Sequence, residues 1–265
     1  MQEITGHTRV FAILGDPITQ VKTPQVVNPR LEALGFAGVV IPCHVAPEDL
    51  AATVASFRRW KNFGGCIITV PHKTAMAALC DTVAPHAQAI GAVNCVRRDP
   101  DGTLHATMLD GLGYVAGMRK HGIEPRGKSV YLAGAGGAAN AIAFAFAEAG
   151  VARLTIANRT RAKSDDLAAR LARLHPGLAV STAPTPVSEH DIVVNATSLG
   201  MKEGDPHPLN FDEIAPHQIV GDAIMQPEKT ALLLAAEAKG CRIHLGRPML
   251  EAQIELFLAH LGVTT

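Results

Sequence analysis

The chain has 265 residues, of which 48% are hydrophobic and 18% charged, so it can bury a large core as one big domain or two ordinary ones. Lysine plus arginine equals aspartate plus glutamate at 24 each, which argues against nucleic-acid or membrane partners and favours a small-molecule partner. No apolar run approaches the roughly 20 residues of a membrane span, and the first residues lack a secretory pattern. The five scattered cysteines, never spaced as CxxC, indicate reduced thiols, no metal site and a cytoplasmic location.

Strand-like apolar runs alternate with helix-like stretches along the chain. This alternation is typical of parallel sheets covered by helices, so the pattern predicts an α/β fold. Turn residues in "DPDG" and "GIEPRGK" bracket a helix between residues 100 and 126, where we expect two domains to meet. We expect strands at 9–14, 37–43, 65–70, 128–133, 152–157, 191–195 and 218–222, and helices at 47–60, 137–149 and 161–174.

The stretch "GDPITQVKTP" follows the first expected strand and indicates a glycine turn, a proline-bracketed loop and the start of a helix. Open α/β sheets bind ligands at the carboxyl ends of their strands, so this loop is a candidate ligand site. Its polar content is unusual, because Gln20 and Thr23 flank an apolar Val21 where a hydroxyl would hold a ligand better.

The strongest motif is "GAGGAA" at residues 134–139, which matches G-x-G-x-x-A between a strand run and a helix. Gly134 permits the tight turn, and Gly136 lets the backbone approach a pyrophosphate. Ala139 lets the helix lie close to the sheet while its first amides face the phosphates. A purely structural glycine turn is the alternative. The candidate cofactor-binding residues of this loop are Gly134, Gly136, Gly137 and Ala138.

The next strand ends in "NRTRAK", which supplies Asn158, Arg159, Thr160 and Lys163 and no carboxylate. A free ribose 2′-hydroxyl requires an acidic residue at this place, whereas a 2′-phosphate requires cations. The sequence therefore predicts NADP as the cofactor. The alternative is that Thr160 only caps the following helix and that the basic residues form its solvated first turn.

Three polar residues stand beside turns where chemistry is expected. Lys73 follows an apolar strand and a proline, Asn94 stands three residues after Gly91, and Asp110 precedes Gly111. A dehydrogenase that acts on an alcohol needs a group to take the hydroxyl proton, and a lysine amine oriented by a carboxylate can do so. Taken singly, each has a plainer interpretation: a solvated lysine, a turn former and a helix cap.

The order of these motifs resembles the shikimate dehydrogenases and the related quinate/shikimate dehydrogenases over nearly the whole chain. The resemblance rests on "GDPITQVKTP", "TVPHK", "GAVN", "LDGLGY", "GAGGAA", "NRTRAK", "VVNATSLGM", "DAIMQPEKTALL" and "GRPMLEAQ". It implies an N-terminal α/β substrate domain with a mostly parallel sheet, residues 1–109 and 241–265. It also implies a C-terminal Rossmann NADP-binding domain, residues 110–240.

The resemblance also implies an NADP-dependent oxidoreductase of aromatic amino acid biosynthesis, a monomer or homodimer that interconverts a shikimate-like cyclic hydroxy acid and its ketone. Lys73 and Asp110 then form the catalytic acid–base pair. The implied substrate-binding residues are Val21, Thr23, Thr69, Asn94 and Gln253. To the cofactor residues above it adds Thr197, Met201 and Gly246, and it assigns Asn158, Arg159, Thr160 and Lys163 to the NADP-selecting loop.

The chain departs from the family at several polar substrate contacts. In place of the family's Ser-x-Ser before proline, this chain has Val21 and Thr23. One of the two hydroxyls that bind the substrate carboxylate in the family is therefore missing. Where the family has an asparagine before the threonine of "TVPHK", this chain has Ile67. Where it has asparagine and threonine before the catalytic aspartate, this chain has Met108 and Leu109, and the family's tyrosine is replaced by Met225. We therefore predict that shikimate is a poor substrate and that the preferred one is less polar where it faces Val21, Ile67, Met108 and Met225.

Two alternatives to a shikimate dehydrogenase remain at this point. One is a family member with a different, less polar substrate, although Gln20, Lys22 or Thr23 could supply a replacement donor. The other is a non-catalytic NADP-binding sensor. Retention of both Lys73 and Asp110 argues against the sensor, which has no use for the pair.

Overall fold

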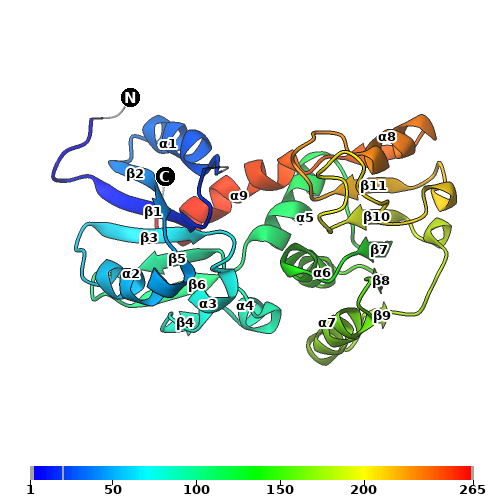
Figure 1. Ribbon diagram of the computed structural model, residues 1–265, viewed down its shortest axis with the longest axis horizontal. Helices are drawn as coiled ribbons and strands as arrows, with labels where there is room; N and C mark the ends of the chain where they lie inside the picture. The colour runs from blue at the N-terminus through cyan, green and yellow to red at the C-terminus, as the bar shows by residue number, and fades with distance from the viewer. Residues whose placement is uncertain (1–2, 20, 264–265) are drawn as a thin grey trace. The chain divides into compact units, whose positions relative to one another are not determined.

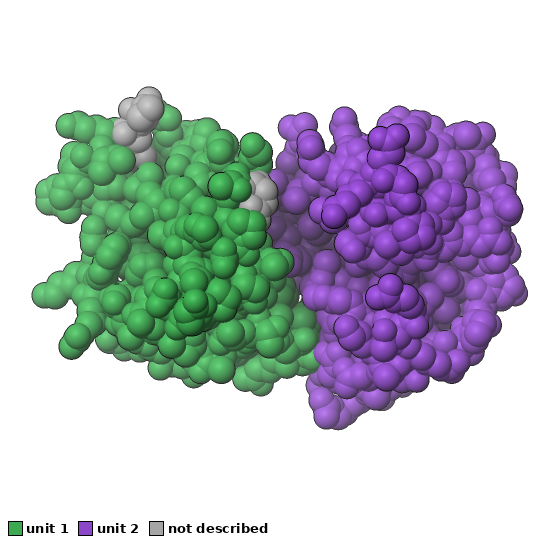
Figure 2. All heavy atoms as spheres, viewed as in Figure 1, with its two compact units in different colours: residues 1–109, 254–265 green, residues 110–253 purple. Residues whose placement is uncertain are grey.

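A computed structural model describes residues 3–19 and 21–263 of the chain, and Gln20 of the opening loop lies outside the described residues. The chain divides into two compact units (Figure 2): unit 1 is residues 1–109 with 254–265, and unit 2 is residues 110–253. The second border thus follows residue 253, whereas we had expected it after residue 240. The physical reason is that β12 (Arg242–His244) pairs with β11 in the sheet of unit 2.

The sheet of unit 1 is mostly parallel, in the order β2-β1-β3-β5-β6-β4 (Figure 1). The pairs β1–β2, β1–β3 and β4–β6 are parallel, and β5 is antiparallel to both β3 and β6. Its strands are β1 (Arg9–Gly15), β2 (Gly38–His44), β3 (Phe63–Ile68), β4 (Thr82–Val83), β5 (Cys95–Arg98) and β6 (Leu104–Thr107). Its helices are α1 (Thr23–Ala33), η1 (Pro47–Asp49), α2 (Leu50–Phe57), α3 (Lys73–Ala77) and α4 (Pro85–Ile90).

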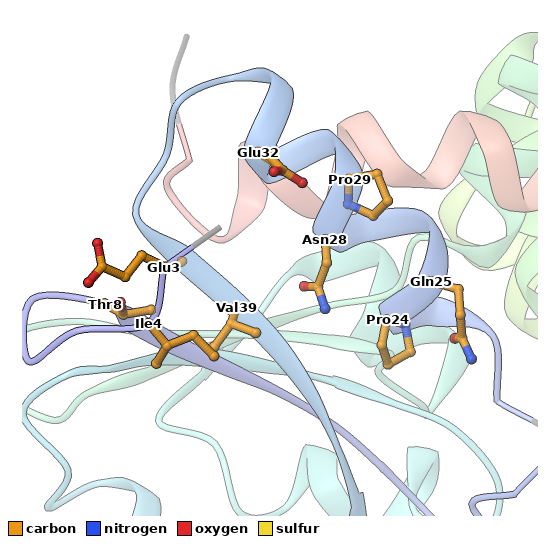
Figure 3. A pocket seen from close by; sticks show the side chains of 10 residues that line it. Glu3, Ile4, Thr8, Pro24, Gln25, Asn28, Pro29, Glu32 and Val39 are labelled. Atoms are coloured by element: carbon orange, nitrogen blue, oxygen red, sulfur yellow. The ribbon is translucent and has the colours of Figure 1, made fainter. Parts of the chain in front are cut away.

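Strand β2 lies at the edge of this sheet, and a side chain of α1 satisfies part of its backbone. The Asn28 amide donates to the Val40 carbonyl at 3.0 Å and accepts from the Val40 N–H at 2.7 Å. It occupies the place of a neighbouring strand and so protects the edge against pairing with another chain. A hollow of about 480 Å³ lies along this flank, lined by Ile4, Asn28 and Val39 among others (Figure 3). None of its described lining residues belongs to the loops that follow β1 and β3.

The sheet of unit 2 is parallel throughout its described pairs, in the order β12-β11-β10-β7-β8-β9. Counted from β7 along the chain, this is the 3-2-1-4-5-6 order of a doubly wound dinucleotide-binding fold. The expected Rossmann architecture is therefore confirmed. Its other strands are β7 (Ser129–Ala133), β8 (Arg153–Ala157), β9 (Ala179–Ser181), β10 (Ile192–Asn195) and β11 (Ile219–Asp222).

Small residues allow the helices of unit 2 to approach closely. A Cβ at Gly111 of α5 (Asp110–Lys120) would overlap the Ala141 carbonyl of α6 (Gly137–Ala149). The backbones of the two helices are therefore in contact where a larger side chain would separate them. The remaining helices are α7 (Arg161–Leu174), η2 (Val187–Glu189), η3 (Phe211–Glu213), α8 (Ala231–Ala238) and α9 (Arg247–His260), whose last seven residues belong to unit 1.

Two polar rings pack edge to face inside unit 2. The ring centroids of Tyr114 and His244 are 5.1 Å apart, and both side chains are buried. Among the described residues, neither the Tyr114 hydroxyl nor His244 Nε2 has a hydrogen-bond partner. Burial, with the nearby charges of His121 and Arg242, lowers the pKa of His244 to about 4.

We expect His244 to make the fold sensitive to acid. Because the unfolded histidine has the higher pKa, near 6.5, its contribution to stability is complete above pH 6.5 and is lost as the pH falls to about 4. At 1.36 kcal/mol per pKa unit, the free energy of unfolding should fall by about 3 kcal/mol from this group. Denaturant titrations at pH 7 and pH 4 measure the loss, which should be smaller in His244→Leu.

The exposed His7 offers a matched control. His7→Leu should lose as much stability between the two pH values as the native chain. An equal loss in His244→Leu would show that this histidine does not control the acid response.

Candidate active site

In unit 1 the loops that follow β1 and β3 lie side by side at the carboxyl ends of these strands. The Thr69 N–H donates to the Leu14 carbonyl at 2.9 Å, and the Asp16 N–H donates to the Val70 carbonyl at 3.0 Å. A Cβ at Gly15 would lie 2.5 Å from Thr69 Cγ2, so the glycine is what allows this approach. Thr69, a predicted substrate-binding residue, is thereby placed where open α/β sheets bind ligands.

Lys73 is the first residue of α3, and its backbone is fixed from two sides. Its carbonyl accepts from the Val93 N–H at 2.9 Å. The preceding His72 is 1% exposed, and its Nε2 donates to the Val45 carbonyl at 2.8 Å. The half-buried Lys73 side chain therefore starts from a rigid base. Sequence reasoning missed His72, although its place beside the lysine in "TVPHK" is a signal.

Asn94 joins three strands of unit 1 and is 2% exposed. Its carbonyl accepts from the Ile68 N–H at 2.8 Å, and its N–H donates to the Thr107 carbonyl at 2.9 Å. The side-chain Oδ1 accepts from the Leu109 N–H at 2.8 Å. The Asn94 side chain thus fixes the peptide that leads out of unit 1. Unit 1 brings Thr69, Lys73 and Asn94 to one end of its sheet.

The residues at which this chain differs from the family are buried to different degrees. Val21 is half-buried, and Thr23, at the start of α1, is 8% exposed. Ile67 and Met108 are 4% and 1% exposed and pack in the core of unit 1. In unit 2, Met225 is 44% exposed. That these side chains face the substrate remains a prediction.

In unit 2, Asp110 and Gln253 are hydrogen bonded to each other. Gln253 Nε2 donates to Asp110 Oδ1 at 3.1 Å, and both side chains are buried. Gly113 leaves room for the glutamine, because a Cβ there would overlap Gln253 Cγ. Asp110 is the first residue of α5, where the backbone N–H groups of the helix favour a negative charge.

The glycine loop after β7 leaves an open space beside its backbone. Gly134 has φ +118°, and a Cβ there would lie 2.9 Å from the Ala196 carbonyl of the loop after β10. Apart from the adjoining backbone, no atom of the described residues lies within 4 Å of the place that a Cβ would take at Gly136 or Gly137. Helix α6 begins at Gly137, so its first amides border this space. The loop lies between the carboxyl ends of β7 and β10, where the strand order reverses, and it fits a dinucleotide pyrophosphate.

The loop after β8 carries the residues expected to select the cofactor. Asn158 Nδ2 donates to the Thr160 carbonyl at 2.8 Å, which closes the turn before α7. The Thr160 side chain makes no capping hydrogen bond, so capping does not explain this residue. Arg159 and Lys163 are exposed and have no ion-pair partner among the described residues, whereas Arg161 lies 3.6 Å from Asp165. The loop presents two cations and no carboxylate, as a 2′-phosphate requires.

A buried carboxylate organises the loops after β10 and β11. Thr197 donates from its N–H and its hydroxyl to Asn195 Oδ1, at 3.0 and 2.7 Å. Asn195 Nδ2 and the Thr230 hydroxyl donate to Asp222, at 3.1 and 2.8 Å. Burial raises the pKa of Asp222, although these hydrogen bonds oppose the shift. Sequence reasoning singled out Thr197 but missed Asn195 and Asp222, which stand within the quoted motifs "VVNATSLGM" and "DAIMQPEKTALL".

Two further cofactor candidates lie near these loops. Met201 is 55% exposed. Gly246 lies against the chain after β11, where a Cβ would overlap the Ile224 carbonyl. The structure thus places the cofactor candidates of unit 2 in loops after β7, β8 and β10 and before α9.

No group of three or more His, Cys, Asp or Glu side chains is placed to hold a metal ion in the described parts of the chain. No described helix has the length and apolar character needed to cross a membrane.

Comparison with known families gives two matches along the chain. Residues 13–96 match the shikimate dehydrogenase substrate binding domain. Residues 118–201 match the shikimate / quinate 5-dehydrogenase domain.

Individual relatives are similar over nearly their whole length. A shikimate dehydrogenase (NADP⁺) of Acidiphilium cryptum is 38% identical over 98% of this chain and 93% of its own. Shikimate 5-dehydrogenase of Listeria monocytogenes, solved with shikimate and NAD, is 30% identical with a TM-score of 0.91, over 100% of this chain and 95% of that one. The Thermus thermophilus enzyme, solved with NADP(H) and shikimate, is 32% identical with a TM-score of 0.86, over 96% and 93%.

We expect the chain to bind NADP⁺ more tightly than NAD⁺, because Arg159 and Lys163 can each form a charge-assisted hydrogen bond with a 2′-phosphate. Such a bond contributes about 1.5–3 kcal/mol, so Arg159→Ala and Lys163→Ala should each weaken NADP⁺ binding about tenfold or more. NAD⁺ binding should change little. Calorimetric titration of both cofactors measures the preference.

Arg161→Ala serves as the control, because this arginine pairs with Asp165 on the same helix. It removes the same charge and should change NADP⁺ affinity much less. Equal or tighter binding of NAD⁺ by the native chain would refute the assignment of this loop.

Proposed function

We propose that this chain, which belongs to the shikimate dehydrogenase family, catalyses the reversible, NADP-dependent oxidation of a shikimate-like cyclic hydroxy acid to its ketone. The observation that carries the proposal is the retention of Lys73 and Asp110 at the positions of the family's acid–base pair. Both family domains match the chain, and the pair is of use only to an enzyme that moves a proton.

In this mechanism Lys73 Nζ takes the proton of the reacting hydroxyl during oxidation and returns it to the ketone oxygen during reduction. Asp110 orients the lysine amine. The rigid backbone around Lys73, fixed by Val93 and His72, supports this role because proton transfer requires a set geometry. When bound, the nicotinamide of NADP accepts the hydride in one direction and donates it in the other.

The remaining site residues bind and orient. We assign Thr69, Asn94, Thr23 and Gln253 to polar contacts with the ring of the substrate. Their support differs: Thr69 and Asn94 meet at one end of the unit 1 sheet, whereas Gln253 already donates to Asp110. A ring with several hydroxyls requires such donors, because a buried hydroxyl without a partner costs about 1–3 kcal/mol.

The cellular setting follows from the same assignment. We propose that the protein acts in aromatic amino acid biosynthesis in the cytoplasm, as a monomer or homodimer. Its scattered cysteines and equal numbers of acidic and basic residues support a reducing compartment and small-molecule partners. A non-catalytic NADP sensor would have no use for the Lys73 and Asp110 pair.

Lys73→Ala should lower kcat by about 10²- to 10⁴-fold, the usual contribution of a general acid–base group. The dissociation constant for NADP⁺ should stay within about twofold, because the expected cofactor residues lie in unit 2. Steady-state kinetics and cofactor titration measure the two effects. The control is Lys61→Ala, an exposed lysine of the same unit. A near-native rate in Lys73→Ala would show that another group moves the proton.

Val21→Ser should raise kcat/KM for shikimate by about tenfold, since a serine hydroxyl would restore one hydrogen bond of about 1–3 kcal/mol to the substrate carboxylate. This variant is preferable to Ile67→Asn, which would place an amide in the core of unit 1. Val39→Ser, in the hollow of Figure 3, is the control and should change nothing. A native kcat/KM already near 10⁵ M⁻¹ s⁻¹, within the ordinary enzyme range, would contradict the expected defect.

A further inference from the structure

The side chain of Asn140 lies directly beneath the glycine loop of unit 2. Asn140 is in the first turn of α6 and is 8% exposed. Its Nδ2 donates to the Gly136 carbonyl at 2.8 Å and to the Ala135 carbonyl at 3.1 Å. One amide group therefore binds two successive carbonyls of the loop.

Helix α7 holds this amide from its other side. Arg170 Nη2 donates to Asn140 Oδ1 at 2.5 Å. Nδ2 of Asn140 donates twice and Oδ1 accepts once, which fixes the orientation of the amide. A reversed amide would place its oxygen against two carbonyl oxygens. The Arg170 guanidinium also pairs with Asp166 at 2.9 Å, one turn earlier on the same helix. The arrangement is a continuous path of hydrogen bonds from α7 to the glycine loop.

The direction of the loop carbonyls matters for an anion. Backbone N–H groups attract phosphate oxygens, whereas carbonyl oxygens repel them. The Asn140 side chain holds the Ala135 carbonyl toward α6. It also reinforces the hold on the Gly136 carbonyl, which accepts from the Asn140 N–H at 2.9 Å as well. Both carbonyls are thereby kept away from the open space beside Gly136 and Gly137. The loop then presents amides on that side.

Arg170 also connects the two halves of the expected cofactor site. It lies on α7. The first turn of this helix contains Lys163, and Arg159 lies just before the helix. The glycine loop, with Asn140 behind it, is expected to hold the pyrophosphate. The hydrogen bond between Asn140 and Arg170 thus fixes the helix of the 2′-phosphate loop to the pyrophosphate loop.

We propose that Asn140 and Arg170 are positioning residues for the dinucleotide: they lock the glycine loop with its amides toward the pyrophosphate and hold α7 at a fixed distance from it. This inference rests on the proposed binding of NADP. It goes further, because it assigns a binding role to two residues that contribute no atom to the expected contacts.

The test measures the affinity of NADP⁺ by calorimetry for Asn140→Ala, Arg170→Met and the double variant. Each single change should weaken NADP⁺ binding about tenfold, because the lost positioning should cost about as much free energy as one hydrogen bond. The double variant should lose little more than either single one, because the two residues act through one connection. Arg170→Lys, which keeps a donor, should recover part of the affinity.

Two controls separate positioning from charge and from stability. Arg173→Met removes an equal charge from an exposed site on the same helix and should leave NADP⁺ affinity unchanged. ADP, which contains a pyrophosphate, should lose affinity with each positioning variant, whereas 2′-AMP, which does not, should lose less. A purely structural role would lower the melting temperature without this difference between ligands.

The outcomes separate the inference from the function on which it rests. Failure of the native chain to bind NADP⁺ would overturn the proposed function. Native binding together with unchanged affinity in Asn140→Ala and Arg170→Met would overturn the positioning role alone. In the active enzyme, the role requires a raised KM for NADP⁺ with kcat nearly unchanged, and a lowered kcat at unchanged KM would overturn it.

Discussion

Parallel strand pairing is the constraint on which both units depend. A parallel pair needs a crossover, so the loops that follow neighbouring strands emerge at the same end of the sheet. In unit 1 this brings the loops after β1 and β3 together, and with them Thr69 and Lys73. In unit 2 it brings together the loops after β7, β8 and β10. Residues far apart in the sequence become neighbours without any direct attraction between their side chains.

Long elements with clear ends could be predicted from the sequence. Helices α6 and α7 begin and end as expected, because their apolar residues follow helical spacing. Strands β5 and β6 were not foreseen. They are four residues each and flank the "DPDG" turn, which we had interpreted as part of a domain seam. Such short strands carry too few residues for a periodicity, and their pairing depends on neighbours elsewhere in the chain.

Some residues of the candidate site could likewise be predicted from the sequence, and others could not. Motif residues such as Gly134 could be identified because glycine has a backbone reason to be there. The residues that fix the loops could not be identified in this way. His72, Asn195 and Asp222 act through hydrogen bonds to segments that come close only when the chain folds. The roles of the single residues in substrate and cofactor binding stay predictions.

Asparagine recurs as the residue that secures irregular backbone. Asn94 accepts from the Leu109 N–H, Asn158 donates to the Thr160 carbonyl, and Asn195 accepts from the Thr197 N–H. A short amide carries a donor and an acceptor, so it can imitate a peptide group where no strand or helix supplies one. Asn28 does the same at a sheet edge. The loops of the candidate site therefore hold their shape without regular secondary structure.

The interrupted course of the chain through unit 1 has a consequence for its biosynthesis. Unit 2 is one continuous segment, whereas unit 1 needs residues 254–265 in addition to 1–109. In this last segment Glu255 forms an ion pair with Arg30 at 2.7 Å, and His260 donates to the His105 carbonyl at 2.9 Å. A ribosome synthesises residues 254–265 after residues 110–253. The unit that is begun first is thus completed only after the whole of unit 2 has been translated, and unit 2 can complete its contacts before it.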